Sequence, residues 1–317
     1  MAFTLFRKKD RTVNFIFTDY AIRFVELRQT DPVIVECYGE RELPEGVLRN
    51  GDIVDYEAFV HILENCLTEW NVKKREARFA VPDNYIAIRE EQLDEDLEED
   101  EIKGYLFLQI GSTIHLPFDE PIFDAVVTGE TNGKKEVLLI AAPEEQVRKF
   151  RELIEEVKLR PKAADIGPLS LYRFFYYQGL TDKNSHELIL HVRRNLMTIS
   201  IFHQHQPKFI KPVSLEVGEQ SPLFEMGEGE VTQVMDALNE VTNVINFYEN
   251  SVHKGNIQMD KVFISGDHPQ LRFIENYVRE TLGMSVVEQE HMEIVDKNGI
   301  SLSRSYYDAV GLGLKEV

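Results

Sequence analysis

Residues 13–28 read VNFIFTDYAIRFVELR, and the fold class can be inferred by starting from them. Two apolar runs, Val13–Phe17 and Ile22–Arg28, flank a short turn at Asp19-Tyr20-Ala21. Runs rich in β-branched and aromatic residues, separated by a turn, are typical of paired antiparallel strands. A third run, Val33–Tyr38, follows directly. The sequence therefore predicts an antiparallel meander near the start of the chain.

The same pattern returns in the second half of the chain. Residues 187–202 read ELILHVRRNLMTISIF, and a further strand is predicted at Lys208–Val213. Apolar residues at spacings of three and four predict helices over Tyr56–Trp70, over Glu144–Lys158 and again after residue 230. Strands followed by helices, repeated after a polar stretch at 181–185, predict two related α/β halves.

Composition excludes several classes of function. The 317 residues include 35 lysines and arginines against 55 aspartates and glutamates, for a formal net charge of −20. Binding to nucleic acid or to an anionic membrane surface normally needs a basic excess, which this chain lacks. The longest uninterrupted apolar run, Val137–Ala142, is far shorter than a membrane-spanning helix. Two cysteines exclude a disulfide scaffold and favour a reducing cytoplasm.

One segment is strongly acidic. Residues 90–101 read EEQLDEDLEEDE, in which nine of twelve positions are acidic. Leu93 and Leu97 are four apart, which is enough for one helical turn to dock. No glycine stands where a calcium-binding loop would bend, so we interpret the run as a solvated face.

Six short motifs in order carry a resemblance to the type IV pilus assembly protein PilM family, from about residue 13 to the C-terminus. The sequence is most similar to divergent Gram-positive members, which accompany a pilus or DNA-uptake system. The motifs are LPEGV at 43–47, NGDI at 50–53, LPF at 116–118, NFYE at 246–249, FISGD at 263–267 and AVGLGL at 309–314.

The resemblance implies an α/β, actin-like (ribonuclease-H-like) fold related to FtsA. The expected domains are 1–177, with a subdomain inserted at about 30–136 that would include the Tyr56–Trp70 helix, and 178–317, whose terminal helix packs back on the first domain. The family implies a scaffold at the cytoplasmic face of the inner membrane. It would hold the short N-terminal tail of the bitopic membrane protein PilN, with the pilus motor ATPase or platform protein as a further partner.

The resemblance also locates the nucleotide site of actin-like proteins. Two loops of the Asp-x-Gly type and a glycine-rich adenosine motif would hold ATP-Mg. At the first loop Asp19 is kept but the glycine is absent. At the second, His191 replaces the aspartate before Arg193, and only Gly266 survives in the adenosine motif. We therefore expect ATP-Mg binding to be weak or lost and the chain not to be an enzyme. If nucleotide binds at all, Asp19, Arg193 and Gly266 would contact it.

Other candidate sites were weighed against simpler interpretations. Asp165-Ile166-Gly167 has the loop pattern but is followed by Pro168, which favours a structural turn at the domain crossover. His203-Gln204-His205 has two histidines on one face of a strand but no third ligand, which favours an exposed hairpin end. The remaining alternative functions are an FtsA-like, ATP-binding polymer former and, with weaker support, a sugar kinase of the same superfamily.

The partner site is predicted to be a groove between the inserted subdomain and the sheet of the first domain. The segments that match the family there contain prolines, which interrupt strands and leave backbone groups available to a peptide. Val81 and Phe118 could equally be ordinary core residues. The acidic run could steer a basic tail. The predicted contact residues are Val81, Pro82, Asn84, Leu116, Pro117 and Phe118.

Overall fold

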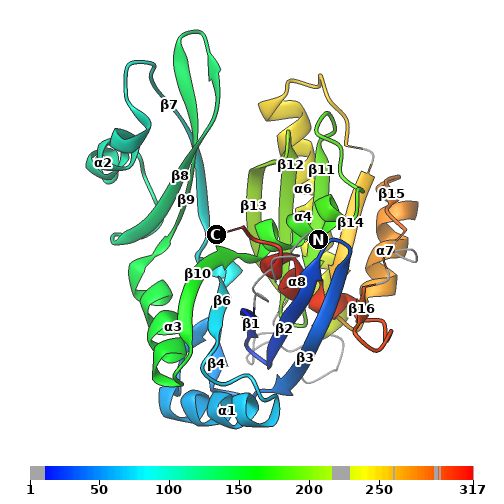
Figure 1. Cartoon of the computed structure of the whole chain (residues 1–317). Coiled ribbons are helices and arrows are strands. Elements are labelled where there is room, and N and C mark those ends of the chain that lie inside the picture. Colours follow the sequence, from blue (N-terminus) through cyan, green and yellow to red (C-terminus); the bar gives the residue numbers. More distant parts are fainter. Residues whose placement is uncertain (1–10, 216–228, 260, 289–291, 293, 317) are drawn as a thin grey trace, which may run out of the picture. The chain divides into compact units, whose positions relative to one another are not determined.

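The computed structural model describes residues 11–215, 229–259, 261–288, 292 and 294–316. The chain forms two compact units that alternate along the sequence (Figure 1). Unit 1 comprises Met1–Pro82, Arg148–Tyr177 and Glu290–Val317, and unit 2 comprises Asp83–Val147 and Gln178–Gln289. The expected division of the sequence at 177/178 into two domains stays a prediction.

Unit 1 is built on a six-stranded sheet of order β10-β6-β1-β2-β3-β16. The first three strands form the predicted meander, while β6 and β10 run parallel to β1, and β16 runs parallel to β3. The strands are β1 (Val13–Thr18), β2 (Ala21–Thr30), β3 (Val33–Glu42), β6 (Glu76–Val81), β10 (Arg160–Ile166) and β16 (Val295–Asp296). A separate pair is formed by β4 (Leu48–Arg49) and β5 (Asp52–Ile53).

Helix α1 (Tyr56–Glu69) belongs to the core of unit 1. The Asp55 side chain caps it by accepting a hydrogen bond from the backbone N–H of Ala58, at 3.0 Å. Phe59 packs edge-on against Phe17 of β1, with ring centroids 5.5 Å apart. The expectation that this helix lies within an inserted subdomain is therefore wrong. Its apolar stripe covers the six-stranded sheet instead.

Further helices pack together in unit 1. Helix α3 (Glu144–Glu156) stacks Phe150 on Phe17. Helix α4 (Gly167–Tyr177) packs against α8 (Tyr307–Gly313), which follows the short helix η3 (Arg304–Tyr306), and Phe174 stacks on Tyr307 at 4.2 Å. A Cβ atom at Gly311 would stand 1.8 Å from the Ser170 carbonyl oxygen, so only glycine permits this approach of α8 to α4.

The larger sheet of unit 2 has five strands in the order β13-β12-β11-β14-β15. It repeats the plan of unit 1, because an antiparallel meander is extended by strands parallel to its first strand. Helices α6 (Gly229–Asn246), continued by a π-helical turn at η2 (Phe247–Val252), and α7 (Leu271–Glu280) contribute to its core. The strands are β11 (Glu187–Val192), β12 (Leu196–His203), β13 (Gln206–Ser214), β14 (Lys261–Gly266) and β15 (Ser285–Val286).

Unit 2 also contains a small subdomain with a sheet of order β7-β9-β8. Its strands are β7 (Ala87–Asp94), β8 (Pro121–Thr131) and β9 (Lys134–Pro143), and its helix is α2 (Glu99–Gln109). Ile102 and Leu106 of α2 share a small core with Leu93 and Leu139. The short helix η1 (Asp83–Tyr85) precedes β7.

The acidic run at 90–101 is a solvated face, as predicted, since nearly all of its acidic side chains are exposed, and regular secondary structure carries it at both ends. Its first part extends β7 to Asp94, and its last part forms the first turn of α2. Acidic side chains are favourable at that end of a helix because they face the positive end of its dipole. Glu98 and Glu101 also form a reciprocal capping box. In the sequence, the high density of acidic residues gives no sign that helix α2 begins within this run.

Candidate functional site

Asp19 lies in the two-residue turn between β1 and β2 of unit 1. Its carboxylate accepts hydrogen bonds from the backbone N–H groups of Asn50, at 2.7 Å, and Gly51, at 2.9 Å. Thr18 closes the same turn through its side chain, which bonds to the backbone N–H and carbonyl of Ala21. The carboxylate therefore serves as an acceptor that anchors the NGDI segment to the hairpin.

Arg193 begins the turn between β11 and β12 of unit 2. Its backbone N–H donates to the Leu196 carbonyl oxygen at 2.8 Å, which closes a tight hairpin without glycine. One guanidinium nitrogen stands 3.6 Å from Oδ2 of Asp83. The same carboxylate oxygen accepts a hydrogen bond from the Thr198 hydroxyl at 2.7 Å. All three side chains are buried, and Asp83 is only 1% exposed.

Gly266 ends β14, where it pairs with Val192 of the neighbouring parallel strand β11. A Cβ atom here would stand 2.0 Å from the Val192 carbonyl oxygen, and the residue has a φ of +131°. The Val192 carbonyl also accepts hydrogen bonds from the backbone N–H groups of Asp267 and His268, at 3.1 and 3.2 Å. Glycine is therefore needed for the approach of one strand end to another.

The groups at these positions bond to neighbouring groups of their own units. A phosphate loop needs glycines whose backbone N–H groups can point at the anion. At Gly266 the nearby N–H groups donate to Val192, and at Arg193 a carboxylate already faces the guanidinium. The structure brings Arg193 and Gly266 to neighbouring strand ends, since Val192 precedes one and pairs with the other. Asp19 belongs to the other unit.

Asp83 is the site residue that sequence reasoning missed. The stretch Pro82-Asp83-Asn84 signals only a turn, and nothing in it indicates a buried ion pair with a residue 110 positions later. The Asp165-Ile166-Gly167 stretch is a junction between β10 and α4, in which Arg173 and Lys315 face Asp165 at 3.0 and 3.6 Å. Its aspartate therefore pairs with basic side chains of its own unit.

The predicted partner-binding residues differ in exposure. Val81 is buried at the end of β6, where it pairs with Ile166, and Pro82 is buried too. Asn84 and Pro117 are exposed. Leu116 and Phe118 are half-buried and pack against the small core that includes Leu106. The 116–118 segment therefore offers apolar surface that Val81 does not, and the role of all six residues stays a prediction.

A histidine cluster occurs at the other end of the β11–β12 hairpin. His186 stacks on His203 with ring centroids 3.9 Å apart, and His253 packs against it at 4.9 Å. Burial, with the neighbouring His203 and His253, lowers the pKa of His186 to about 4. Across the described part of the chain, no group of three histidine, cysteine, aspartate or glutamate residues is arranged to hold a metal.

Neither cysteine has the environment of a nucleophile. Both thiols are free. Burial, reinforced by Glu26, raises the pKa of Cys37 to about 12. Burial raises the pKa of Cys66 to about 11. A catalytic thiol needs a lowered pKa, and burial has the opposite effect on both thiols.

Comparison with known families assigns the chain. The sequence profile described as type IV pilus assembly protein PilM matches residues 16–215, which is more than half of the chain. The chain belongs to the PilM family. No significant match occurs among curated protein sequences. Within the described residues of this PilM family member, no helix has the length and apolar character to cross a membrane.

Solved structures support the fold. The PilM-PilN type IV pilus biogenesis complex is similar with a TM-score of 0.78 at 17% identity, covering 96% of this chain and 98% of that one. A Bacteroides thetaiotaomicron protein with an actin-like ATPase fold has a TM-score of 0.50 at 13% identity, with full coverage of both chains. MreB5 of Spiroplasma citri bound to ADP has a TM-score of 0.53 at 9% identity, covering 96% and 95%. The predicted actin-like α/β fold is confirmed.

Proposed function

We propose that this PilM family member is a non-enzymatic scaffold of a type IV pilus or DNA-uptake pilus assembly machine. The observation that carries the proposal is the family match over residues 16–215. In this role the protein sits at the cytoplasmic face of the cell membrane and is held there by its partners. The principal partner is a PilN-like bitopic membrane protein, and the motor ATPase or platform protein is a further one.

The partner's contribution is a short N-terminal cytoplasmic tail. The similarity to a solved PilM-PilN complex supports this assignment. Among the six predicted contact residues, the 116–118 segment is the best placed to receive a peptide. Leu116 and Phe118 are half-buried and Pro117 is exposed, so apolar side chains and a strand-interrupting proline meet solvent together. Extended peptides gain affinity from such apolar pockets and from backbone hydrogen bonds.

The test is calorimetric titration with a synthetic peptide of the tail of the PilN-like protein from the same genome. Phe118→Asp should weaken binding at least tenfold, because it places a charge in the contact. Phe273→Asp on α7 is the matched control, since Phe273 is also partly exposed and the chemical change is identical. Both variants must melt cooperatively. Unchanged affinity for folded Phe118→Asp would place the contact elsewhere.

Val81→Asp is tested alongside these variants, but it is expected to act on folding rather than on the contact itself. Val81 is buried within the six-stranded sheet, so a carboxylate there would lack compensation and should unfold unit 1. If Val81→Asp instead folds normally and loses tail binding, Val81 contributes to the contact directly.

We also infer that this function uses no nucleotide. The engagement of Asp19, Arg193 and Gly266 with neighbouring groups of their own units supports this inference. A ligand present at about 100 times its dissociation constant would add ~2.7 kcal/mol to the free energy of unfolding. We expect no shift in melting temperature with millimolar Mg-ATP. A clear shift would favour the ATP-binding, FtsA-like alternative instead.

A further inference from the structure

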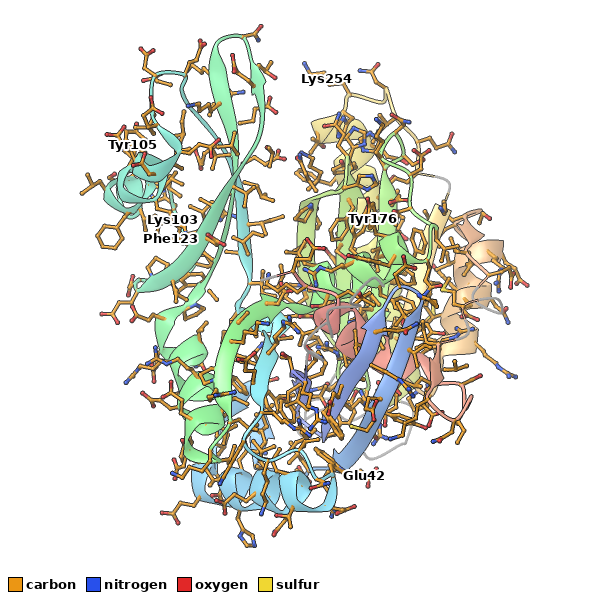
Figure 2. The ribbon with its side chains drawn as sticks, in the orientation of Figure 1. Glu42, Lys103, Tyr105, Phe123, Tyr176 and Lys254 are labelled. Carbon is orange, nitrogen blue, oxygen red and sulfur yellow. The ribbon has the colours of Figure 1, made fainter. Side chains whose placement is uncertain are left out.

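Helix α2 of the small subdomain exposes large apolar side chains on the side turned away from its core. Ile102 and Leu106 are buried, whereas Phe107 and Leu108 are 66% and 75% exposed and Tyr105 is exposed as well. Figure 2 labels Tyr105 and Lys103 on this helix. Neighbouring exposed apolar residues of this kind commonly mark an interaction surface.

An acidic cleft is lined in part by Tyr105 of this helix, and Leu108 follows about one turn later on the same face of α2. The cleft has a volume of about 470 Å³, and its walls come from the end of β7, the loop that follows, α2 and the turn between β8 and β9. Its volume is in the range of small-ligand sites. The lining residues are Asp94, Glu95, Asp96, Leu97, Glu101, Tyr105 and Gly133.

The cleft holds more negative than positive charge. None of its four carboxylates forms an ion pair with a lysine or arginine in the part of the chain that the structure describes. Lys103 pairs with Asp124 at 2.6 Å, outside the cleft lining. Lys135 donates to the carbonyl oxygen of Leu97, a residue of the cleft wall, at 2.6 Å, so one ammonium group lies beside the four carboxylates. The cleft therefore presents net negative charge beside an apolar helix face.

The negative charge of the cleft and the exposed apolar side chains together indicate which kind of ligand would bind. Phosphate groups of nucleic acids and anionic lipids would be repelled by the carboxylates. The described residues offer no group arranged for a metal ion. A guanidinium group suits both the carboxylates, which it can bind in a bidentate manner, and the Tyr105 ring, on which it can stack. The exposed Leu108 adds a contact for an apolar residue next to that arginine.

We infer that Tyr105, Leu108 and the adjoining cleft, together the α2 surface, form a docking site for a segment of a partner protein. The segment carries arginine next to apolar side chains. This site shares no residue with the predicted tail contact at 116–118, so either assignment can fail without the other. It gives the subdomain a second interaction surface.

The test uses the full chain and a fluorescein-labelled octapeptide of alternating leucine and arginine. Binding is followed by fluorescence anisotropy. We expect saturable binding that weakens with added salt, since part of the attraction is between exposed charges. Glutamate in place of arginine should abolish binding, and serine in place of leucine should weaken it severalfold. If the peptide with glutamate in place of arginine binds as tightly as the original peptide, the argument from charge is wrong.

Protein variants locate the binding. Glu95→Gln combined with Asp96→Asn should weaken the peptide about tenfold, as coupled charge pairs do. Leu108→Ser should weaken it about threefold without loss of stability, because a strongly exposed side chain is removed. The matched control is Glu152→Gln combined with Glu155→Gln on α3, which changes the net charge equally.

Three outcomes overturn the proposal. Equal weakening by the control pair would show a general response to net charge. If none of these substitutions affects peptide binding, the peptide binds elsewhere on the protein. Stronger binding to vesicles containing phosphatidylserine than to neutral vesicles, lost on Leu108→Ser, would make the α2 surface a membrane contact instead.

Discussion

The β1–β2 and β11–β12 hairpins open the two main sheets in the same way, yet their turns are stabilised by opposite chemistry. In the first turn, the Asp19 carboxylate accepts two backbone N–H groups. In the second, Arg193 is a cation that faces the buried carboxylate of Asp83. Both turns lack the glycines that would leave room for a ligand. Their polar groups bond instead to residues far away in sequence.

The two turns therefore differ in how easily water can replace the groups that stabilise them. The first turn lies partly exposed, and its hydrogen bonds compete with water. At the second turn, Arg193 and its partner Asp83 are buried, so their ion pair and the close strand contact at Gly266 are hard to replace. We therefore expect substitutions at the second hairpin to cost far more stability than equivalent changes at the first.

The largest effect is expected for Gly266→Ala. The added Cβ would meet the Val192 carbonyl oxygen at 2.0 Å, and the φ of +131° is unfavourable for alanine. We expect a loss of more than about 4 kcal/mol in the free energy of unfolding, measured by urea denaturation. Gly39→Ala in β3 of unit 1 meets the Phe24 and Trp70 side chains at 2.8 Å, which can move, so it should cost less.

Gly104→Ala is the control for both glycine variants. Gly104 lies in α2, and an added Cβ has no atom within 4 Å. Alanine should stabilise this helix by about 0.5–1 kcal/mol. A Gly266→Ala protein as stable as the parent would show that the backbone contact at the end of β14 is not required.

The next largest effect is expected for Asp83→Ala. The substitution removes the carboxylate that faces Arg193 and accepts the Thr198 hydroxyl. Removing one partner of a buried ion pair typically costs about 3–5 kcal/mol. Thermal and urea unfolding should both show the loss, and Asp83→Ala combined with Arg193→Met should recover part of it. If the double variant is no more stable than Asp83→Ala, the two side chains are not coupled.

How much of this could be read from the sequence depends on the range of the interactions. Strand β11 (Glu187–Val192) lies within the stretch 187–202 in which the sequence predicts a return of the strand pattern, because most of its side chains are apolar. Helix α2 was missed because its first turn is acidic, and acidic residues also fill solvated loops. Strand β16 has two residues, Val295–Asp296, and depends on pairing with β3, so no local pattern reveals it.

The candidate site was predictable only in part. Sequence reasoning identified Asp19, Arg193 and Gly266 and expected their loops to be degenerate. It gave no sign of Asp83, because burial of a carboxylate depends on a partner brought close by folding. For the same reason it placed α1 in an inserted subdomain, although the contact of Phe59 with Phe17 belongs to unit 1.

A smaller effect is expected for Asp19→Ala. Two hydrogen bonds from backbone N–H groups to a charged acceptor are lost, but the turn is partly exposed and water can replace the carboxylate. We expect a loss of about 1–2 kcal/mol by urea denaturation. Asp19→Asn, which keeps one oxygen acceptor, should lose less. A cost for Asp19→Ala above that of Asp83→Ala would reverse the comparison between the hairpins.

The smallest effect on stability is expected at the end of the β11–β12 hairpin that lies away from its turn. Imidazole side chains cluster there, whereas the β1–β2 hairpin has no such cluster among its described residues. His186 bonds to the Tyr248 hydroxyl at 3.0 Å, and the groups that face it are His203, His253, Tyr248 and, through its charge, Lys208. Its pKa is lowered from 6.5 to about 4, so between these values the unfolded chain binds more protons than the folded one. The contribution of His186 to the free energy of unfolding is therefore present at pH 7 and decreases as the pH falls towards 4.

The measurement is the melting temperature between pH 7 and pH 5 for the parent and for His186→Asn. Carboxylates titrate in both proteins, so the difference between the two curves isolates the imidazole. The parent should lose about 2 °C more than the variant over this interval, a small amount because His186 is partly exposed and solvent screens its charge. His61→Asn, which makes the same chemical change at an exposed position of α1, is the control. Parallel curves for the parent and His186→Asn would mean that the cluster does not exclude protons in the folded state.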